Sequence, residues 1–367
     1  MEYLWGVKAS FQLQLQVQVQ VQLEKYYDYM SGSNVSTVPT SPRSVVHSLY
    51  VLKALLAFVV VEAHSPMLLP WVKIPGSLVE IFFMISGYFL YHTDLNKVYA
   101  NIKKSIKKVL IVLLILQVFY SFYMRGLGLI YLEDWSLIKT PVPWILWLTQ
   151  GYSPIASGHL WFLVAMLYSL ISFGVFLRLT RGRWIPVLFL LVIGWGLIGP
   201  FRPVFWGEAP SIFEFNFLGR ALPTLAIGYY VRQNEAALLR LNWLSIYAVI
   251  LALGGLEYLA CDLYMGSGYA ASWIHFIGLP TALFMCFLSY KDLGKGSILE
   301  HIGMRYAGNI YYFHKVVFLL WEYLNPKYPL LEEVYHKAGG LIVFMITLPI
   351  AWAIIKIQDR YSWNILR

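Results

Sequence analysis

Charged side chains are scarce in this chain of 367 residues: only 13% are Asp, Glu, Lys or Arg, whereas 59% are hydrophobic. Soluble domains carry roughly a quarter charged residues, so this composition excludes an ordinary soluble fold with an ionised surface. The mean hydropathy of +0.61 points the same way. We therefore expect lipid to be the solvent for much of the chain, and we predict a polytopic membrane protein.

Cysteine is also rare, with 2 residues in the whole sequence. Two thiols exclude a disulfide framework and a cysteine-cluster metal site, and Cys261 and Cys286 lie in apolar runs typical of inert buried thiols. No GxSxG, HExxH or phosphate-binding glycine loop with lysine occurs. We predict no metal site and no nucleic-acid binding, because the basic residues follow the expected membrane topology instead of forming a patch on a soluble domain.

Residues 1–45 differ from the rest of the chain. Phe11–Leu23 alternates apolar residues with Gln, a period-two pattern without helical periodicity. The polar stretch Ser31–Ser44 is typical of a linker. We predict that residues 1–45 are an N-terminal extension that is disordered or dispensable, so that a chain beginning at Met30 retains activity.

Apolar segments long enough to approach a bilayer span recur from residue 46 to 356. Most of the 28 Lys and Arg residues fall on the side of the two termini, which the positive-inside rule assigns to the cytoplasm. Residues 357–367 then form a short cytoplasmic tail. We predict an all-α polytopic membrane protein with ten transmembrane helices, over 46–64, 77–92, 107–124, 160–178, 185–200, 216–232, 244–262, 273–290, 306–323 and 340–356.

Ionisable side chains inside these segments are the best indicators of a site, because charge in a membrane interior is costly. In the first segment, Lys53 and His64 are eleven residues apart, roughly 16 Å along a helix, and return to nearly the same face. Glu80 in the second segment has two readings: it orients His64, or it neutralises Lys53. The sequence leaves this choice open.

Further polar residues stand near the ends or the middle of other segments. Lys104 and Lys107 of KKSIKK share a helix face, and their cluster is either a topology signal or a clamp for the phosphates of an anionic ligand. Arg220 requires a partner or an anionic ligand, because its charge is permanent. The other residues of this kind are His159, Trp161 and His314. Together they predict a polar site between helices.

Five segments, in the right order, resemble the acyltransferase-3 family of membrane acyltransferases. Lys53 and His64 have the spacing of the Arg-x10-His motif in its first helix, and VEIFFMISGYFL is similar to its second-helix pattern. GHLWFLVAMLYSLI, FLGRALPTLAIGYYV and NIYYFHK resemble later segments, the last with Tyr311 and His314. In this chain, lysine replaces the family's arginine at positions 53, 104 and 107, which keeps the charge but loses the bidentate fork.

The resemblance implies transfer of an acyl group, commonly acetyl from acetyl-CoA as co-substrate, to hydroxyl groups of cell-envelope or exported glycans or lipid-linked sugars. It implies a multi-pass protein of the bacterial cytoplasmic membrane. His64 would be the general base or a transient acyl carrier, with Lys53 and Glu80 as further catalytic residues. Lys104 and Lys107 would hold the CoA moiety. Residues that would bind or support the substrate are His159, Trp161, Arg220, Tyr311 and His314.

Negative charge that develops on the thioester oxygen needs stabilisation. The candidates are Lys53, Arg220 and the pair of His159 and Trp161. Two other functions keep the polar interior without catalysis, namely a transporter of glycans or lipid-linked sugars and a membrane partner in a polysaccharide assembly complex. The acyl group, the acceptor and the oligomeric state, including a homo-oligomer, stay open.

Overall fold

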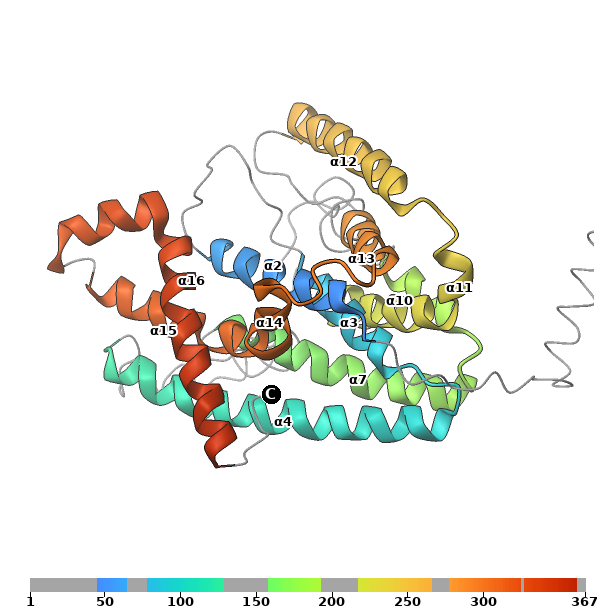
Figure 1. Ribbon diagram of the computed structural model, residues 1–367, viewed down its shortest axis with the longest axis horizontal. Coiled ribbons are helices and arrows are strands. Elements are labelled where there is room, and N and C mark those ends of the chain that lie inside the picture. Colours follow the sequence, from blue (N-terminus) through green and yellow to red (C-terminus); the bar gives the residue numbers. More distant parts are fainter. Residues whose placement is uncertain are drawn as a thin grey trace, which may run out of the picture. The chain divides into compact units, whose positions relative to one another are not determined.

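The computed structural model describes residues 45–64, 78–128, 158–192, 217–265, 277–324 and 327–361. The chain divides into two units, Met1–Val45 and Val46–Arg367, and the description concerns the second. The predictions for Phe11–Leu23, Ser31–Ser44 and Met30 lie outside the described residues. All regular structure within the described ranges is helical (Figure 1), which confirms the predicted all-α class.

The described part of the chain contains nine longer helices. They are α2 (His47–Glu62), α3 (Glu80–Leu90), α4 (Leu95–Gly126), α7 (Trp161–Thr180), α10 (Leu222–Gln233), α12 (Trp243–Met265), α13 (Leu279–Ser289), α15 (Ala307–Leu324) and α16 (Pro329–Arg360). Shorter elements are η2 (Gly158–Leu160), η3 (Ile185–Phe189), the π-helix η5 (Phe217–Ala221), α11 (Glu235–Leu238) and α14 (Ile298–Arg305).

Local sequence signals explain where several helices begin. Pro223, Pro280 and Pro329 stand in the first turns of α10, α13 and α16, where the missing amide proton is not needed. The Asp94 side chain caps α4 by accepting the amide of Asn96 at 2.9 Å. Such caps satisfy amide groups that the first turn leaves without a helical partner.

The predicted membrane segments are only partly established. Three helices are long and apolar enough to cross a bilayer, namely Leu95–Gly126, Gly158–Thr180 and Glu332–Arg360, and shorter apolar helices occupy Glu80–Leu90, Trp243–Glu257 and Leu279–Ser289. A helix lies in each predicted segment, although the fifth is described only to residue 192. The membrane character is therefore supported, whereas the count of ten spans and the orientation of the termini stay predictions.

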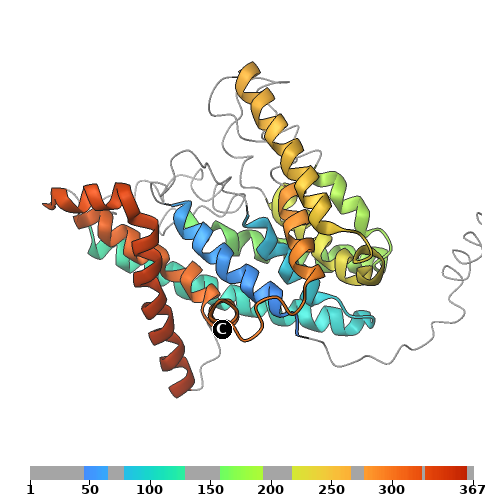
Figure 2. The same ribbon diagram turned by 45° about the horizontal axis from the view of Figure 1, so that its top comes forward.

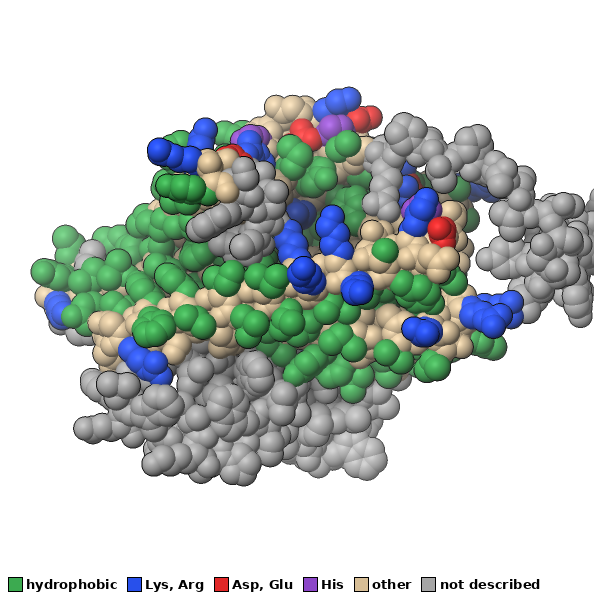
Figure 3. Space-filling view, turned by 90° about the horizontal axis from the view of Figure 1, so that it is seen from below, with side chains coloured by type: hydrophobic (Ala, Val, Ile, Leu, Met, Phe, Trp, Pro, Cys, Tyr) green, Lys and Arg blue, Asp and Glu red, His purple; other side chains and the backbone are tan. Residues whose placement is uncertain are grey.

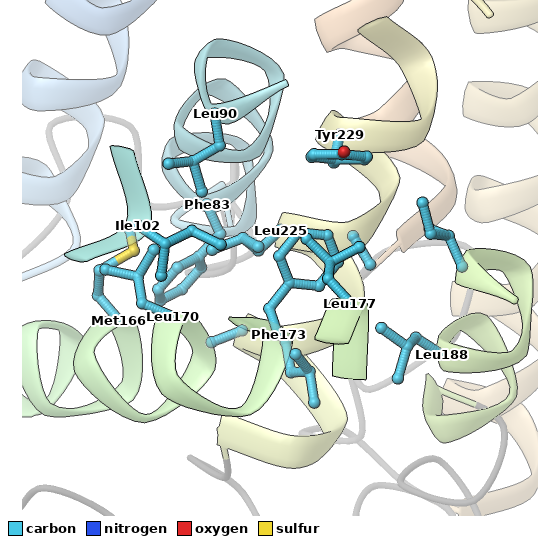
Figure 4. Close-up of a cluster of buried hydrophobic side chains, with 14 of the residues drawn as sticks. Phe83, Leu90, Ile102, Met166, Leu170, Phe173, Leu177, Leu188, Leu225 and Tyr229 are labelled. Atoms are coloured by element: carbon cyan, nitrogen blue, oxygen red, sulfur yellow. The ribbon is translucent and has the colours of Figure 1, made fainter. Parts of the chain in front are cut away.

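The largest buried cluster joins α3, α4, α7 and α10 (Figure 4). Phe83, Phe173 and Leu225 are fully buried within it. Close contact between α3 and α10 depends on two glycines: a Cβ at Gly87 would lie 1.9 Å from the carbonyl oxygen of Leu225, and one at Gly228 would lie 1.9 Å from that of Met84. Small residues permit this approach of two helix backbones.

A network of ion pairs and hydrogen bonds around Glu235 joins the ends of α3 and α10 to the turn after α13. The Tyr88 hydroxyl donates to Glu235 at 2.8 Å, and Glu235 also pairs with Arg232 and Lys291. Partial burial opposes ionisation of Glu235, but hydrogen bonds from Lys291, Tyr88 and Arg232 outweigh it and hold the pKa of this carboxyl below its ordinary value. The network fixes the start of α11 against α3, α10 and the turn that follows α13.

Candidate active site

Three histidine rings from distant parts of the sequence come together. His64 follows the last turn of α2, His159 lies in η2, and His314 lies in the middle of α15. The His64 and His314 rings are stacked with centroids 5.2 Å apart, and His159 meets His314 edge-on at 5.3 Å. His159 and His314 are buried, whereas His64 is exposed. The histidines therefore line a path from an accessible ring to a buried one.

The tautomer of His314 follows from its hydrogen bond. Its Nδ1 lies 2.8 Å from the carbonyl oxygen of Tyr311, and a carbonyl only accepts, so Nδ1 carries the proton and Nε2 carries a lone pair. This Nε2 is buried and has no hydrogen-bond partner among the described residues. A buried acceptor without a donor costs about 1–3 kcal/mol, which fits a position that a bound hydroxyl group completes.

Tyrosines hold the segments that carry these histidines. The Tyr311 hydroxyl donates to the carbonyl oxygen of His159. From α4, Tyr120 donates to the carbonyl oxygen of Tyr312 at 2.6 Å, and Tyr123 donates to that of Val316 at 2.8 Å. These bonds bracket the His314 turn of α15, so α4 sets the position of the central ring.

A buried ion pair lies against Trp161, which follows His159 by two residues in the chain. Arg220 Nε and Nη2 lie 2.7 Å and 2.5 Å from Glu80 Oε1, and the guanidinium lies 5.5 Å from the Trp161 ring centroid. Within the described ranges, Glu80 forms its ion pair with Arg220. The sequence had offered two other partners for Glu80, His64 and Lys53. The π-helix η5 carries Arg220 into this position.

Lysines form a second polar group, away from the histidines. Lys104 and Lys107 are exposed on α4. The charge of Lys53 on α2 interacts with that of Lys108, which in turn interacts with that of Lys104. Lys and Arg side chains gather near the middle of the face shown in Figure 3. Because eleven residues of helix separate Lys53 from His64, about 16 Å, Lys53 belongs with these lysines and not with the imidazoles.

Among the residues that the structure describes, no three His, Cys, Asp or Glu side chains are placed to hold a metal ion. The imidazole rings of His64 and His314 stack, and that of His159 meets His314 edge-on. Neutral imidazoles in this arrangement are suited to accept and pass protons.

The comparison with protein families decides the class. The family model for the acyltransferase-3 domain, described as an acyltransferase domain, matches residues 46–356. The chain belongs to this family. With its apolar helices, it is a membrane acyltransferase in the general sense. No curated protein and no solved structure matches it.

In this acyltransferase, the residues selected from the sequence fall into three groups: the histidines with Tyr311, the Glu80 pair with Trp161, and the lysines. Tyr120, Tyr123 and Phe318 were not selected. The ring centroid of Phe318 lies 6.4 Å from that of His64 and 6.1 Å from that of His314. Aromatic residues in apolar helices are too common for the sequence to single out these three.

Proposed function

We propose that this acyltransferase moves an acyl group, acetyl in the simplest case, from cytoplasmic acyl-CoA to a hydroxyl of a cell-envelope or exported polysaccharide or a lipid-linked sugar. The observation that carries the proposal is the stack of His64 on His314, beside His159, within an acyltransferase domain. An exposed imidazole next to a buried one gives a hydroxyl substrate access and a proton acceptor in the same place.

The lysine group supports the use of acyl-CoA as donor. Lys104 and Lys107 are exposed, as groups that meet phosphates from solution must be, and lysine binds phosphate as a point charge. Lys53 extends this positive group onto α2, and we assign it to CoA binding instead of the chemical step. The long, flexible pantetheine arm of CoA would carry the thioester from the lysines toward His64.

In the chemical step, His64 takes the proton of the acceptor hydroxyl while the hydroxyl oxygen bonds to the thioester carbon. The carbonyl electron pair moves onto oxygen, and its return breaks the carbon–sulfur bond, so the acyl ester and CoA thiolate leave. The thiolate receives the proton that His64 took. A route through an acyl-histidine on His64 uses the same residues, and a rapid quench that traps acylated enzyme would distinguish it.

The buried histidines support this role of His64. Stacking on His314 holds the His64 ring beyond the last turn of α2. The unpartnered Nε2 of His314 offers a second acceptor for a hydroxyl group. General-base catalysis of this kind contributes about 10²–10⁴-fold to a rate.

The test is release of free CoA thiol from acetyl-CoA by detergent-purified protein, with cell-envelope glycans as acceptor. We expect release by the wild type and a loss of at least about 100-fold in His64→Ala. Changing both Lys104 and Lys107 to alanine should raise the KM for acetyl-CoA and leave kcat nearly unchanged. Lys337→Ala is the control, because this exposed lysine lies on α16, outside the lysine group of α2 and α4.

No release from folded wild-type protein would contradict the proposal and favour the transporter. Under that alternative, His64→Ala would leave the cellular phenotype intact. An unchanged KM for acetyl-CoA in the double lysine variant would show that the lysine cluster does not bind CoA and serves only as a signal of membrane topology.

A further inference from the structure

The proposed reaction places negative charge on the thioester oxygen, and a cation near the histidines would stabilise it. Two cations considered from the sequence are not placed for this task. Arg220 is held by the Glu80 carboxylate, and Lys53 lies about 16 Å from His64 along α2. The structure offers another cation, Lys315, which directly follows His314 on α15.

Phe318 brings Lys315 and the histidines to one place. The Lys315 Nζ lies 5.3 Å from the centroid of the Phe318 ring. The rings of His64 and His314 also meet Phe318, with centroids 6.4 Å and 6.1 Å away. Neighbouring residues point about 100° apart on a helix, but Phe318 is three residues after Lys315 and four after His314, and both spacings bring side chains together.

The charge of Lys315 acts on the whole histidine group. It interacts with His64, His159 and His314, and in the described part of the chain no other lysine or arginine does so for all three. Lys315 is half-buried, which strengthens its field relative to that of a fully solvated ammonium. The carboxylate of Glu322, two turns further along α15, also acts on Lys315, but Glu322 is exposed.

We propose that the Lys315 ammonium stabilises the oxyanion formed when the acceptor hydroxyl attacks the thioester. The proposal rests on the proposed function and adds to it the residue that meets the new charge. As the carbon–oxygen bond forms, the carbonyl electron pair moves to the oxygen that faces Lys315, while the hydroxyl proton goes to His64. When the pair returns, the carbon–sulfur bond breaks and the ammonium is left as it began.

The test compares Lys315→Met, Lys315→Arg and the control Lys337→Met in the CoA-release assay, with melting temperatures measured in detergent. Methionine keeps much of the length and loses the charge. We expect kcat to fall about 100-fold in Lys315→Met, with the KM values for acetyl-CoA and for the glycan acceptor within twofold of wild type. Lys315→Arg should keep at least a tenth of the wild-type kcat. Lys337, an exposed partner of Glu333, should be replaceable without effect.

Three results would overturn the role of Lys315. One is an unchanged kcat in Lys315→Met; another is a raised KM for the acceptor with kcat retained, which makes Lys315 a binding residue. A third is equal loss of kcat in the arginine and methionine variants, which removes charge as the cause. If methionine prevents folding, the folded arginine variant decides the matter, and a kcat below a tenth of the wild-type value overturns the role. If the wild type releases no CoA, the reaction itself fails, whereas an active wild type with active Lys315→Met refutes this inference alone.

Discussion

At the residue scale, the Glu80–Arg220 pair shows how a buried charge is retained. Both side chains are almost fully covered, with exposed fractions of 1% and 5%, and an isolated ion in such surroundings would be strongly disfavoured. Glu80 is the first residue of α3, where the helix dipole favours a negative charge. Trp161 covers the guanidinium. The pair therefore joins α3, η5 and α7 at one point.

We predict strong coupling between these two residues. Replacing either partner alone, in Glu80→Gln or Arg220→Met, should destabilise the protein by about 3–5 kcal/mol, because the remaining group is left buried without its counter-charge. The double variant should be much less destabilised than the sum of the two. Unfolding in detergent, followed by circular dichroism over a full double-mutant cycle, measures the coupling. Additive losses would show that the two charges are stabilised separately.

The sequence allowed the site residues to be selected but not paired. His64, His159 and His314 stood out because ionisable groups are rare in apolar runs. Their stacking was not predictable, since they come from three separate segments and no spacing relates them. Glu80 had two open partners on α2, and its actual partner, Arg220, lies 140 positions away in the chain. Contacts of this range depend on how helices pack, which single-sequence patterns do not encode.

At the scale of helices, the crossing of α3 and α10 is a close backbone contact that involves the helix carrying Glu80. Gly87 and Gly228 face backbone carbonyl groups of the opposite helix, and a backbone cannot move aside as a flexible side chain can. Glu80 is the first residue of α3, and α10 begins directly after η5, which carries Arg220. A change in their separation should therefore reach the ion pair.

Gly87→Ala is predicted to destabilise the protein by about 1–3 kcal/mol or more, because its Cβ must push α10 away. Gly255→Ala on α12 is the matched control: nothing lies within 4 Å of its added Cβ, and alanine is the better helix former. Thermal unfolding in detergent compares the two variants. Equal stability of Gly87→Ala and Gly255→Ala would mean that α3 and α10 move apart without loss of stability, which contradicts the prediction.

Helix positions were largely predictable, and the differences have physical causes. The predicted segment 107–124 begins late because hydropathy detects only the apolar half of α4, whereas the capped helix starts at Leu95. Similarly, α16 starts at Pro329 and bends at Ala338, where the backbone leaves helical geometry at φ −151°. The amphipathic α14 was missed because it has only 8 residues. Its Gly303 packs against the carbonyl of Tyr50 on α2.

At the scale of the whole membrane unit, two polar groups mark different levels along the helices. On α2, Lys53 and His64 are about 16 Å apart, and on α4, Lys108 and Tyr120 are about 18 Å apart. Figure 2 shows α2, α4 and α15 from a second direction. Lys53 interacts with Lys108, and Tyr120 contacts His159. On both α2 and α4, the lysine therefore lies nearer the start of the helix, and the residue of the histidine group lies nearer its end. Such a separation suits a donor and an acceptor that arrive from opposite sides of a membrane.

The proposed function requires the lysines to face the cytoplasm, where acyl-CoA is made, and the residues after α15 to face the other side of the membrane. We predict that, in a protein with Cys261 and Cys286 changed to alanine, a membrane-impermeant maleimide labels Lys337→Cys in intact spheroplasts. Lys103→Cys should be labelled only after the membrane is opened. Both positions are exposed, so access to the reagent depends on the side of the membrane. The reverse pattern would place the lysines outside, where they could not meet cytoplasmic CoA, and would remove the route by which the thioester reaches His64.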